Sequence, residues 1–251
     1  MDIPKLGLGT MGIDDPATIE TAIEMGYRHL DTAQIYDNEA AVGDGIDRAG
    51  VDRDDLVVAT KLWIDQLDRV RESTEESLDR LGLDRVDVLY VHRPKGEYDP
   101  EATLAALDEL REDGIADAVA VSNFEVGDLD RFRDVLGRAP AANQIEYHPL
   151  FQPADRLADA RDHDYPLVAY SPLAGGEARD VDAVVEVADR HGVTPEQASL
   201  AWLLEKGIHP IPKASSREHL EANRAALDID LDADDVEAID GIERENELYP
   251  E

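Results

Sequence analysis

The first residues whose types and spacing could do chemistry are three glycines close to the start of the chain. Gly7, Gly9 and Gly12 form a Gly-x-Gly-x-x-Gly pattern behind the short apolar run Ile3–Leu8. Asp31 follows about 20 residues later, at the end of a second apolar run. In a Rossmann fold, such glycines let the backbone approach a pyrophosphate, and the acidic residue binds a ribose. The spacing therefore indicates dinucleotide binding, although a single glycine pattern is a weak signal.

Polar residues also end or follow a series of short apolar runs that we predict to be strands. The runs are Ile3–Leu8, Tyr27–Leu30, Leu56–Ala59, Val86–Val91, Ala118–Val121, Ala142–Ile145, Leu167–Tyr170 and Ile208–Ile211. The polar residues at their ends are Gly9-Thr10, Asp31, Lys61, His92, Ser122-Asn123, Gln144, Tyr170-Ser171 and Lys213. Functional side chains collect at the carboxyl ends of strands in α/β barrels. The repeated placement predicts one site built from all the strand ends.

Amphipathic segments between these runs predict helices. The strongest signals are a start at Asp15-Pro16, segments 72–81 and 100–110, and a capping box at Thr194–Gln197 with proline at the first helical position. A last helical pattern covers 234–242, and we expect no long C-terminal loop to cover the site. Eight βα units without a linker predict an α/β protein with a single (β/α)8 TIM-barrel domain over residues 1–251.

The barrel prediction changes the interpretation of the glycines. Gly12 precedes the helix start at Asp14–Pro16, whereas the third glycine of the Rossmann pattern packs inside the helix. A doubly wound sheet also commonly has only about six strands. We therefore expect Gly7 and Gly9 to permit a tight turn at the barrel rim. A Rossmann dehydrogenase stays as an alternative, which would need Asp31 on the ribose and no role for Lys213.

The charge balance is extreme, with 58 acidic against 24 basic residues and a net charge of −34. This excludes the basic surface that a nucleic-acid backbone requires. Only five basic residues are lysines, and an acid-rich, lysine-poor surface is typical of proteins from halophiles. Self-repulsion of this size strains a compact state, and molar salt screens it. We predict a requirement for salt.

Cysteine is absent, so the chain has no disulfide and no thiolate metal site. No apolar run is long enough to span a bilayer, and no apolar leader follows Met1. We expect a cytoplasmic protein without a membrane partner, acting as a monomer.

Nine motifs together resemble the aldo-keto reductase family over essentially the whole chain. They are Gly7–Thr10, Arg28–Ala33, Tyr36 with Asn38-Glu39, Thr60–Trp63, Val91-His92, Ser122–Phe124, Asn143–Pro149, Tyr170–Leu173 and Ile211–Lys213. The resemblance implies reduction of aldehydes or ketones to alcohols with a nicotinamide dinucleotide. The short loops resemble prokaryotic members of the 2,5-diketogluconate reductase type, which act on small or sugar-derived carbonyls. A dinucleotide-binding regulatory or redox-sensing subunit with little turnover is the alternative.

The resemblance assigns a catalytic tetrad, Asp31, Tyr36, Lys61 and His92. Tyr36 would donate the proton, and the Lys61 ammonium would lower the pKa of the phenol toward the working range. Asp31 would partner the buried ammonium, and His92 would orient the carbonyl. The other histidines are expected to be structural or superficial, namely His29, His148, His163, His191 and His209. No metal is expected.

For the cofactor, the resemblance implies that Ser122, Asn123 and Gln144 bind the carboxamide and that Tyr170 stacks on the nicotinamide. The pyrophosphate would lie along Ser171, Leu173 and Gly175, with Gly9, Thr10 and Asp31 nearby. Ala174–Gly176 is a candidate mobile lid. The 2′-phosphate end would involve Lys213, Ser215, Ser216, Arg217, His219 and Asn223.

Cations and hydroxyls at a helix start suit a 2′-phosphate, so NADP(H) is favoured. The family often has arginine in place of His219 and glutamate in place of Ala222, and these departures leave NAD(H) possible.

The expected substrate pocket is open and permissive, walled by Met11, Trp63, Arg93 and Phe124. Met11 and Arg93 stand where the family often has bulky aromatic residues. Arg93 could attract a substrate carboxylate or simply face solvent.

Overall fold

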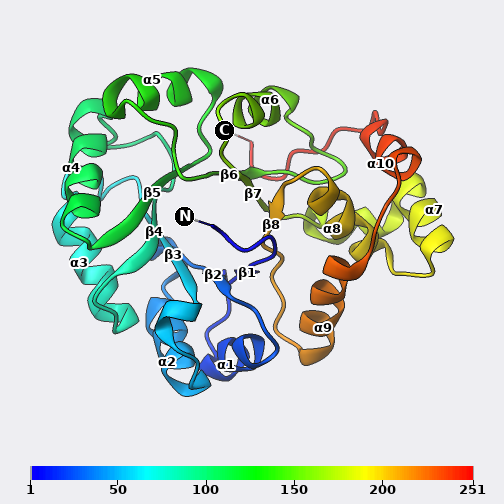
Figure 1. Cartoon of the computed structure of the whole chain (residues 1–251), viewed down its shortest axis with the longest axis horizontal. Helices are drawn as coiled ribbons and strands as arrows, with labels where there is room; N and C mark the ends of the chain where they lie inside the picture. The colour runs from blue at the N-terminus through cyan, green and yellow to red at the C-terminus, as the bar shows by residue number, and fades with distance from the viewer. Residues whose placement is uncertain (1, 251) are drawn as a thin grey trace.

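A computed structural model describes residues 2–250 of the chain. Eight parallel strands form one central sheet in which neighbours follow the chain order β1 to β8, and the helices surround this sheet (Figure 1). The strands are β1 Leu8–Gly9, β2 His29–Asp31, β3 Val57–Leu62, β4 Val86–Val91, β5 Ala116–Ser122, β6 Asn143–Glu146, β7 Leu167–Tyr170 and β8 His209–Pro210. The predicted (β/α)8 barrel is confirmed.

Helices connect the strands and cover the outside of the barrel (Figure 1). They are α1 Pro16–Glu24, α2 Glu39–Ala49, α3 Val70–Leu81, α4 Pro100–Glu112, α5 Val126–Leu136, α6 Ala154–Asp162, α7 Asp182–His191, α8 Pro195–Glu205, α9 Arg217–Ala225 and α10 Ala233–Asp240. Short 3-10 turns are η1 Gln34–Tyr36, η2 Arg53–Asp55, η3 Ala174–Asp180 and η4 Ala226–Asp228. The helix starts predicted at Pro16 and Pro195 are both observed, with Asp15 and Thr194 as caps.

The barrel closes between its first and last strands through an irregular ladder. Gly7 N donates to Pro210 O at 3.0 Å, and Gly9 N donates to Pro212 O at 3.3 Å. Pro212, which would return the first of these bonds in a parallel ladder, has no N–H. The observed β1 covers only Leu8–Gly9 instead of the predicted Ile3–Leu8.

The expected tight turn at Gly7 and Gly9 is corrected by the structure, because neither residue has a positive φ. Both glycines instead allow close packing. A Cβ on Gly7 would lie 2.5 Å from His29 Nδ1, and one on Gly9 would lie 2.6 Å from Ile211 O. Gly12, with φ of 70°, is the glycine that turns the chain.

The core has an inner and an outer part. Inside the barrel, small and medium side chains pack together, among them Ile3, Ala59, Val88, Tyr90 and Ile211. A larger apolar layer fills the space between strands and helices. Because neighbouring residues of a strand face opposite sides, Ala59 and Lys61 of β3 both face inward while Val58 and Thr60 face the helices. The alternation therefore places inward-facing polar residues such as Lys61 at the carboxyl end of the barrel.

Candidate active site

A buried ion pair lies at the centre of the carboxyl end of the barrel. Lys61 on β3 is completely buried, and its Nζ binds Oδ1 of Asp31 at the end of β2. The ammonium also donates to Thr32 O at 2.8 Å. In the β2–β3 register Asp31 is opposite Ala59, so Lys61 is two residues further along and its side chain comes back to meet the carboxylate. A buried ammonium needs such a partner, since removal from water is costly.

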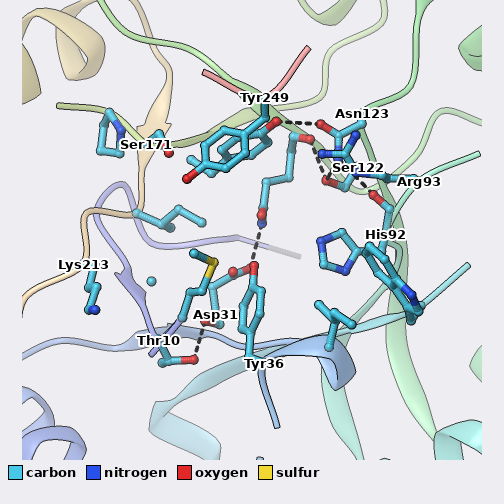
Figure 2. A pocket seen from close by; sticks show the side chains of 18 residues that line it. Thr10, Asp31, Tyr36, His92, Arg93, Ser122, Asn123, Ser171, Lys213 and Tyr249 are labelled. Carbon is cyan, nitrogen blue, oxygen red and sulfur yellow. Dashed lines mark hydrogen bonds between the residues drawn. The ribbon is translucent and has the colours of Figure 1, made fainter. Parts of the chain in front are cut away.

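Tyr36 follows β2 in the short η1 turn, and its side chain lies beside that of Asp31 in the cavity (Figure 2). The Lys61 Nζ lies 5.1 Å from the centre of the phenol ring. Burial raises the pKa of Tyr36, and the Lys61 charge opposes this but does not outweigh it. The expected net lowering of the Tyr36 pKa is therefore wrong for this structure. Burial also lowers the pKa of Lys61, but Asp31 and Tyr36 together raise it, so the ammonium stays charged.

His92 lies next to Tyr36 at the end of β4, under the indole of Trp63. The His92 ring centre is 6.0 Å from that of Tyr36 and 5.0 Å from that of Trp63, edge to face in both cases. Burial, with the charges of Lys61 and Arg93, lowers the His92 pKa to about 2. The imidazole is therefore neutral at physiological pH.

Strands β5 to β7 contribute a second group of polar side chains. Gln144 Nε2 donates to Asp31 Oδ2 at 2.7 Å, and Ser122 Oγ donates to Gln144 O at 2.9 Å. Tyr170 Oη donates to Asn123 Oδ1 at 2.9 Å, and this bond is visible in Figure 2. Asn123 and Ser171 both have positive φ, at 59° and 49°. Such strained conformations in non-glycine residues cluster at functional sites.

The two groups line one cavity of 360 Å³ (Figure 2). Among the predicted site residues, its walls contain Gly9, Thr10, Met11, Asp31, Tyr36, Trp63, His92, Arg93, Ser122, Asn123, Gln144, Tyr170, Ser171 and Lys213. Lys61 lies behind the wall, bound to Asp31. Residues from the ends of all eight strands thus meet at one place, as the sequence pattern predicts.

Phe124 is the predicted pocket residue that the structure places elsewhere. Its side chain is fully buried in the outer core and packs edge to face on Tyr98, with ring centres 5.5 Å apart. Asn123 adopts a left-handed conformation just before it, which redirects the chain so that the Asn123 side chain faces the cavity and the Phe124 ring packs in the core. The aromatic side chain of Phe124 alone does not reveal the backbone conformation of the residue before it.

Four lining residues were missing from the predicted site, namely Ile35, Pro172, Ile211 and Tyr249. Pro172 and Ile211 lie inside the motifs Tyr170–Leu173 and Ile211–Lys213, beside predicted site residues. Ile35, which is 49% exposed, directly precedes Tyr36 in η1, and this adjacency to a predicted site residue could have identified it. Tyr249 comes from the chain segment after α10, which runs back to the barrel beside β6 (Figure 1). We expected no long C-terminal loop over the site, and the structure corrects this by showing that the short segment after α10 reaches the cavity. No local pattern in the sequence signals this contact.

The predicted phosphate-binding residues continue from one end of the cavity. Lys213 follows β8 and is exposed, and a Cβ on Gly12 would lie 3.1 Å from its Nζ. Ser215, Ser216, Arg217 and His219 are exposed at the start of α9, where Ser216 is the N-cap and accepts from His219 N at 3.2 Å. Asn223 is buried on the same helix. Leu173 precedes η3 as its N-cap and Gly175 lies within η3, with φ of 62°, and neither residue lines the cavity.

Within residues 2–250, no cluster of three or more potential metal ligands is present. No helix of that described part is long and apolar enough to cross a membrane.

The barrel and the cavity at its carboxyl end define a (β/α)8 protein whose site places acid–base side chains beside polar side chains from β5 to β7. The sequence model of the aldo/keto reductase family matches residues 5–244. The chain belongs to the aldo/keto reductase family, whose members reduce carbonyl groups with nicotinamide dinucleotides.

Relatives agree over nearly full length. The chain is 38% identical over 256 residues to methylglyoxal reductase DkgB of Escherichia coli O157:H7, covering 99% of this chain and 96% of that protein. The structure of MGS-M4, an aldo-keto reductase enzyme from a Medee basin deep-sea metagenome library, superposes with a TM-score of 0.95 at 31% identity, covering 100% and 95% of the two chains. The aldose reductase of Schistosoma japonicum gives 0.93 at 28% identity, covering 99% and 91%.

Proposed function

We propose that this protein reduces small aldehydes and ketones with NADPH and that Tyr36 gives the proton to the carbonyl oxygen. The observation that carries the proposal is the buried Asp31–Lys61 pair beside the Tyr36 phenol, in a cavity shared with His92. The pair lies against the cavity wall where Tyr36, His92 and Trp63 meet, which distinguishes it from a purely structural ion pair.

Carbonyl reduction needs a hydride on carbon and a proton on oxygen, and the reduced nicotinamide supplies the hydride when bound. Tyr36 holds its proton at neutral pH, since the ordinary pKa of a phenol is about 10 and burial raises it further. Lys61 stabilises the phenolate that remains after the proton has left, since an adjacent positive charge favours the anion. Asp31 keeps that ammonium in place. The tetrad thus lets the Tyr36 phenol act as a proton donor while it stays protonated before the reaction.

His92 orients the substrate. With a pKa of about 2, its imidazole stays neutral and offers an N–H to a carbonyl oxygen without competing for the Tyr36 proton. Trp63 packs on the ring and fixes its plane.

The cavity and the start of α9 together suit a nicotinamide dinucleotide. Tyr170 is held at its hydroxyl by Asn123, which leaves a fixed aromatic ring at the cavity wall for stacking. Gln144 uses its N–H on Asp31, so its amide oxygen is the atom suited to accept from a carboxamide. At the far end, the first amides of α9 have no partner within the helix and favour an anion.

A preference for NADPH over NADH is part of the proposal. Lys213, one of only five lysines in the chain, lines the cavity, and Ser215 and Arg217 lie close to it in the sequence. Arg217 is engaged only loosely, 3.8 Å from Glu221, so it can turn toward a 2′-phosphate.

Small dicarbonyls are the proposed substrates. The relatives named methylglyoxal reductase support this class. Met11 and Ile35 leave the cavity mouth open, since about half of each side chain is exposed, at 52% and 49%. Arg93 lines the same cavity and would favour substrates that carry a carboxylate.

The direct test is NADPH oxidation with methylglyoxal or glyceraldehyde in high salt, comparing the wild type with Tyr36→Phe. We expect turnover to fall by about 10²-fold or more in the variant, while NADPH binding followed by fluorescence is retained. Equal and very slow turnover of both proteins, with both binding NADPH, would instead indicate a nucleotide-binding regulatory subunit.

A further inference from the structure

The chain after α10 forms a strap that lies across the barrel mouth, and we define the C-terminal strap as residues 243–249. Its first half is fastened to the loops. Asn246 N donates to Leu150 O at 2.7 Å, and Asn246 Nδ2 donates to Glu177 Oε1 at 3.1 Å. Arg244 pairs with the other carboxylate oxygen of Glu177. These contacts bring the strap over the η3 segment and toward β6.

The second half of the strap is held by a buried carboxylate inside the barrel mouth. Glu146, only 3% exposed, ends β6 two residues after Gln144. Its Oε1 accepts from Leu248 N at 2.6 Å, and its Oε2 accepts from Tyr249 N at 3.0 Å. One side chain therefore binds two consecutive backbone amides from a segment more than a hundred residues away.

His148 fixes the orientation of that carboxylate. Its Nδ1 accepts from Leu150 N at 3.2 Å, so the proton is on Nε2, which donates to Glu146 Oε1 at 2.8 Å. His148 is fully buried, and Glu146 receives three hydrogen bonds in all. A carboxylate is suited to this position because all of its partners are donors.

The anchored strap delivers one side chain to the cavity. The Tyr249 ring lines the cavity wall and meets the ring of Tyr170 edge to face, with centres 5.8 Å apart. Tyr170 in turn donates to Asn123, so Tyr249 presses on the residue pair placed at the nicotinamide end. Tyr249 itself is half-exposed and has no bond at its backbone N–H other than that to Glu146.

We propose that Glu146 is a positioning residue which, by binding the amides of Leu248 and Tyr249, makes Tyr249 a specificity-determining wall of the carbonyl pocket. The specificity role rests on the proposed reductase function, whereas the anchoring role does not. Releasing the strap removes one wall of an otherwise open cavity. Bulky carbonyl substrates then gain room, and small ones lose a contact.

The anchor is tested without substrate by hydrogen–deuterium exchange of the C-terminal peptide. In the wild type, the amides of Asn246, Leu248 and Tyr249 are expected to exchange slowly. Glu146→Gln keeps the side-chain size but turns an N–H₂ group toward one of the backbone donors, so the last two amides should lose protection while Asn246 keeps most of its own. Glu247→Gln makes the same charge change at an exposed strap residue and should leave all three protected.

The specificity role is tested by the ratio of kcat/KM for phenylglyoxal to that for methylglyoxal, with NADPH. Tyr249→Ala should raise this ratio by about tenfold, mainly through KM, because a wall contact affects binding more than chemistry. Glu146→Gln should shift it in the same direction. Since Glu146 acts through Tyr249, the double variant should shift it no further than Tyr249→Ala alone.

Each outcome decides the proposal. Unchanged exchange in Glu146→Gln would overturn the anchor, and additive effects in the double variant would show that Glu146 acts by another route. If Glu146→Gln does not fold, Tyr249→Ala and the wild-type exchange pattern decide, and a wild type without protection at Leu248 and Tyr249 refutes the proposal. A wild type that binds NADPH but reduces neither glyoxal overturns the proposed function and the specificity role together, while the exchange result stands separately.

Discussion

Gln144 on β6 donates to Asp31 on β2 across the barrel mouth, with Nε2 and Oδ2 2.7 Å apart. The other oxygen of Asp31 binds Lys61. The carboxylate therefore joins Lys61 of the acid–base group to Gln144, the side chain that the proposed function assigns to the carboxamide of the cofactor. A change at Asp31 should disturb both catalysis and cofactor binding.

Asp31→Asn tests this connection. Asparagine would set an N–H₂ group against either Lys61 Nζ or Gln144 Nε2, and the buried ammonium would lose its counter-charge. Breaking a buried pair in this way costs about 3–5 kcal/mol, so we expect a lower unfolding free energy in urea together with a large drop in kcat. Asp14→Asn, at an exposed position, is the matched control and should change neither. A stable, fully active Asp31→Asn protein would show that the pair is not needed.

Trp63 and Phe124 should respond differently to truncation. Trp63 lines the cavity and contacts His92, so Trp63→Ala should raise the KM for methylglyoxal and lower kcat. Phe124 is buried in the core, so Phe124→Ala should cost about 3–5 kcal/mol of stability and leave the KM of the folded enzyme close to the wild-type value. Urea unfolding and steady-state kinetics on both variants check this. A selective KM effect of Phe124→Ala at unchanged stability would restore it to the pocket.

Lys213 should set the cofactor preference. Lys213→Ala is expected to weaken NADPH binding by about tenfold and NADH binding much less. The reason is that only NADPH carries the 2′-phosphate that the proposed function assigns to Lys213. Lys5→Ala removes a charge at another exposed position and serves as the control. Equal effects of Lys213→Ala on the two cofactors, measured by fluorescence titration, would place the phosphate elsewhere.

The buried His29 predicts acid sensitivity. Burial, which outweighs the opposing charges of Asp31 and Asp87 and is assisted by His209 and Lys61, lowers the pKa of His29 to about 4. Unfolding restores the ordinary value near 6.5, so between these pH values the unfolded chain binds a proton that the folded protein refuses. Stability should fall as the pH drops through this window, by about 1.4 kcal/mol per pH unit for one such group. His92, with its pKa of about 2, adds to the loss.

His29→Asn is the variant that isolates this effect. It is expected to be less stable at neutral pH but to show a shallower dependence of unfolding free energy on pH between about 4 and 6.5. Parallel wild-type and variant curves in that range would exclude His29 as a source of the slope.

The net charge of −34 predicts salt-dependent stability. Many arginines are already engaged with carboxylates, as in Arg133 with Asp159 and Arg53 with Asp87, so most of the excess negative charge is uncompensated. We expect the melting temperature to rise between about 0.1 M and about 2 M KCl, where the Debye length falls from about 10 Å to below 3 Å. Equal melting temperatures at the two concentrations would refute the prediction.

Much of the fold follows from local sequence patterns. The runs Val86–Val91 and Leu167–Tyr170 coincide with β4 and β7, and the Thr194 capping box begins α8 as predicted. Such features depend on side-chain period and on neighbouring residues, both of which are visible in one dimension. The prediction for the first strand is less accurate, because its pairing partners, β2 and the segment around Pro210 and Pro212, come from distant parts of the chain.

The sequence by itself also determined which polar residues end the strands, among them Asp31, Lys61 and His92. The resemblance to the family added Tyr36, which lies in η1 and ends no strand. Only the tertiary structure decided the positions that depend on a turn or on distant contacts. Phe124 went into the core because Asn123 takes a left-handed conformation, and Tyr249 came into the cavity because Glu146 binds its amide. The net pKa of Tyr36 likewise depends on burial, which arises only when the whole barrel closes around it.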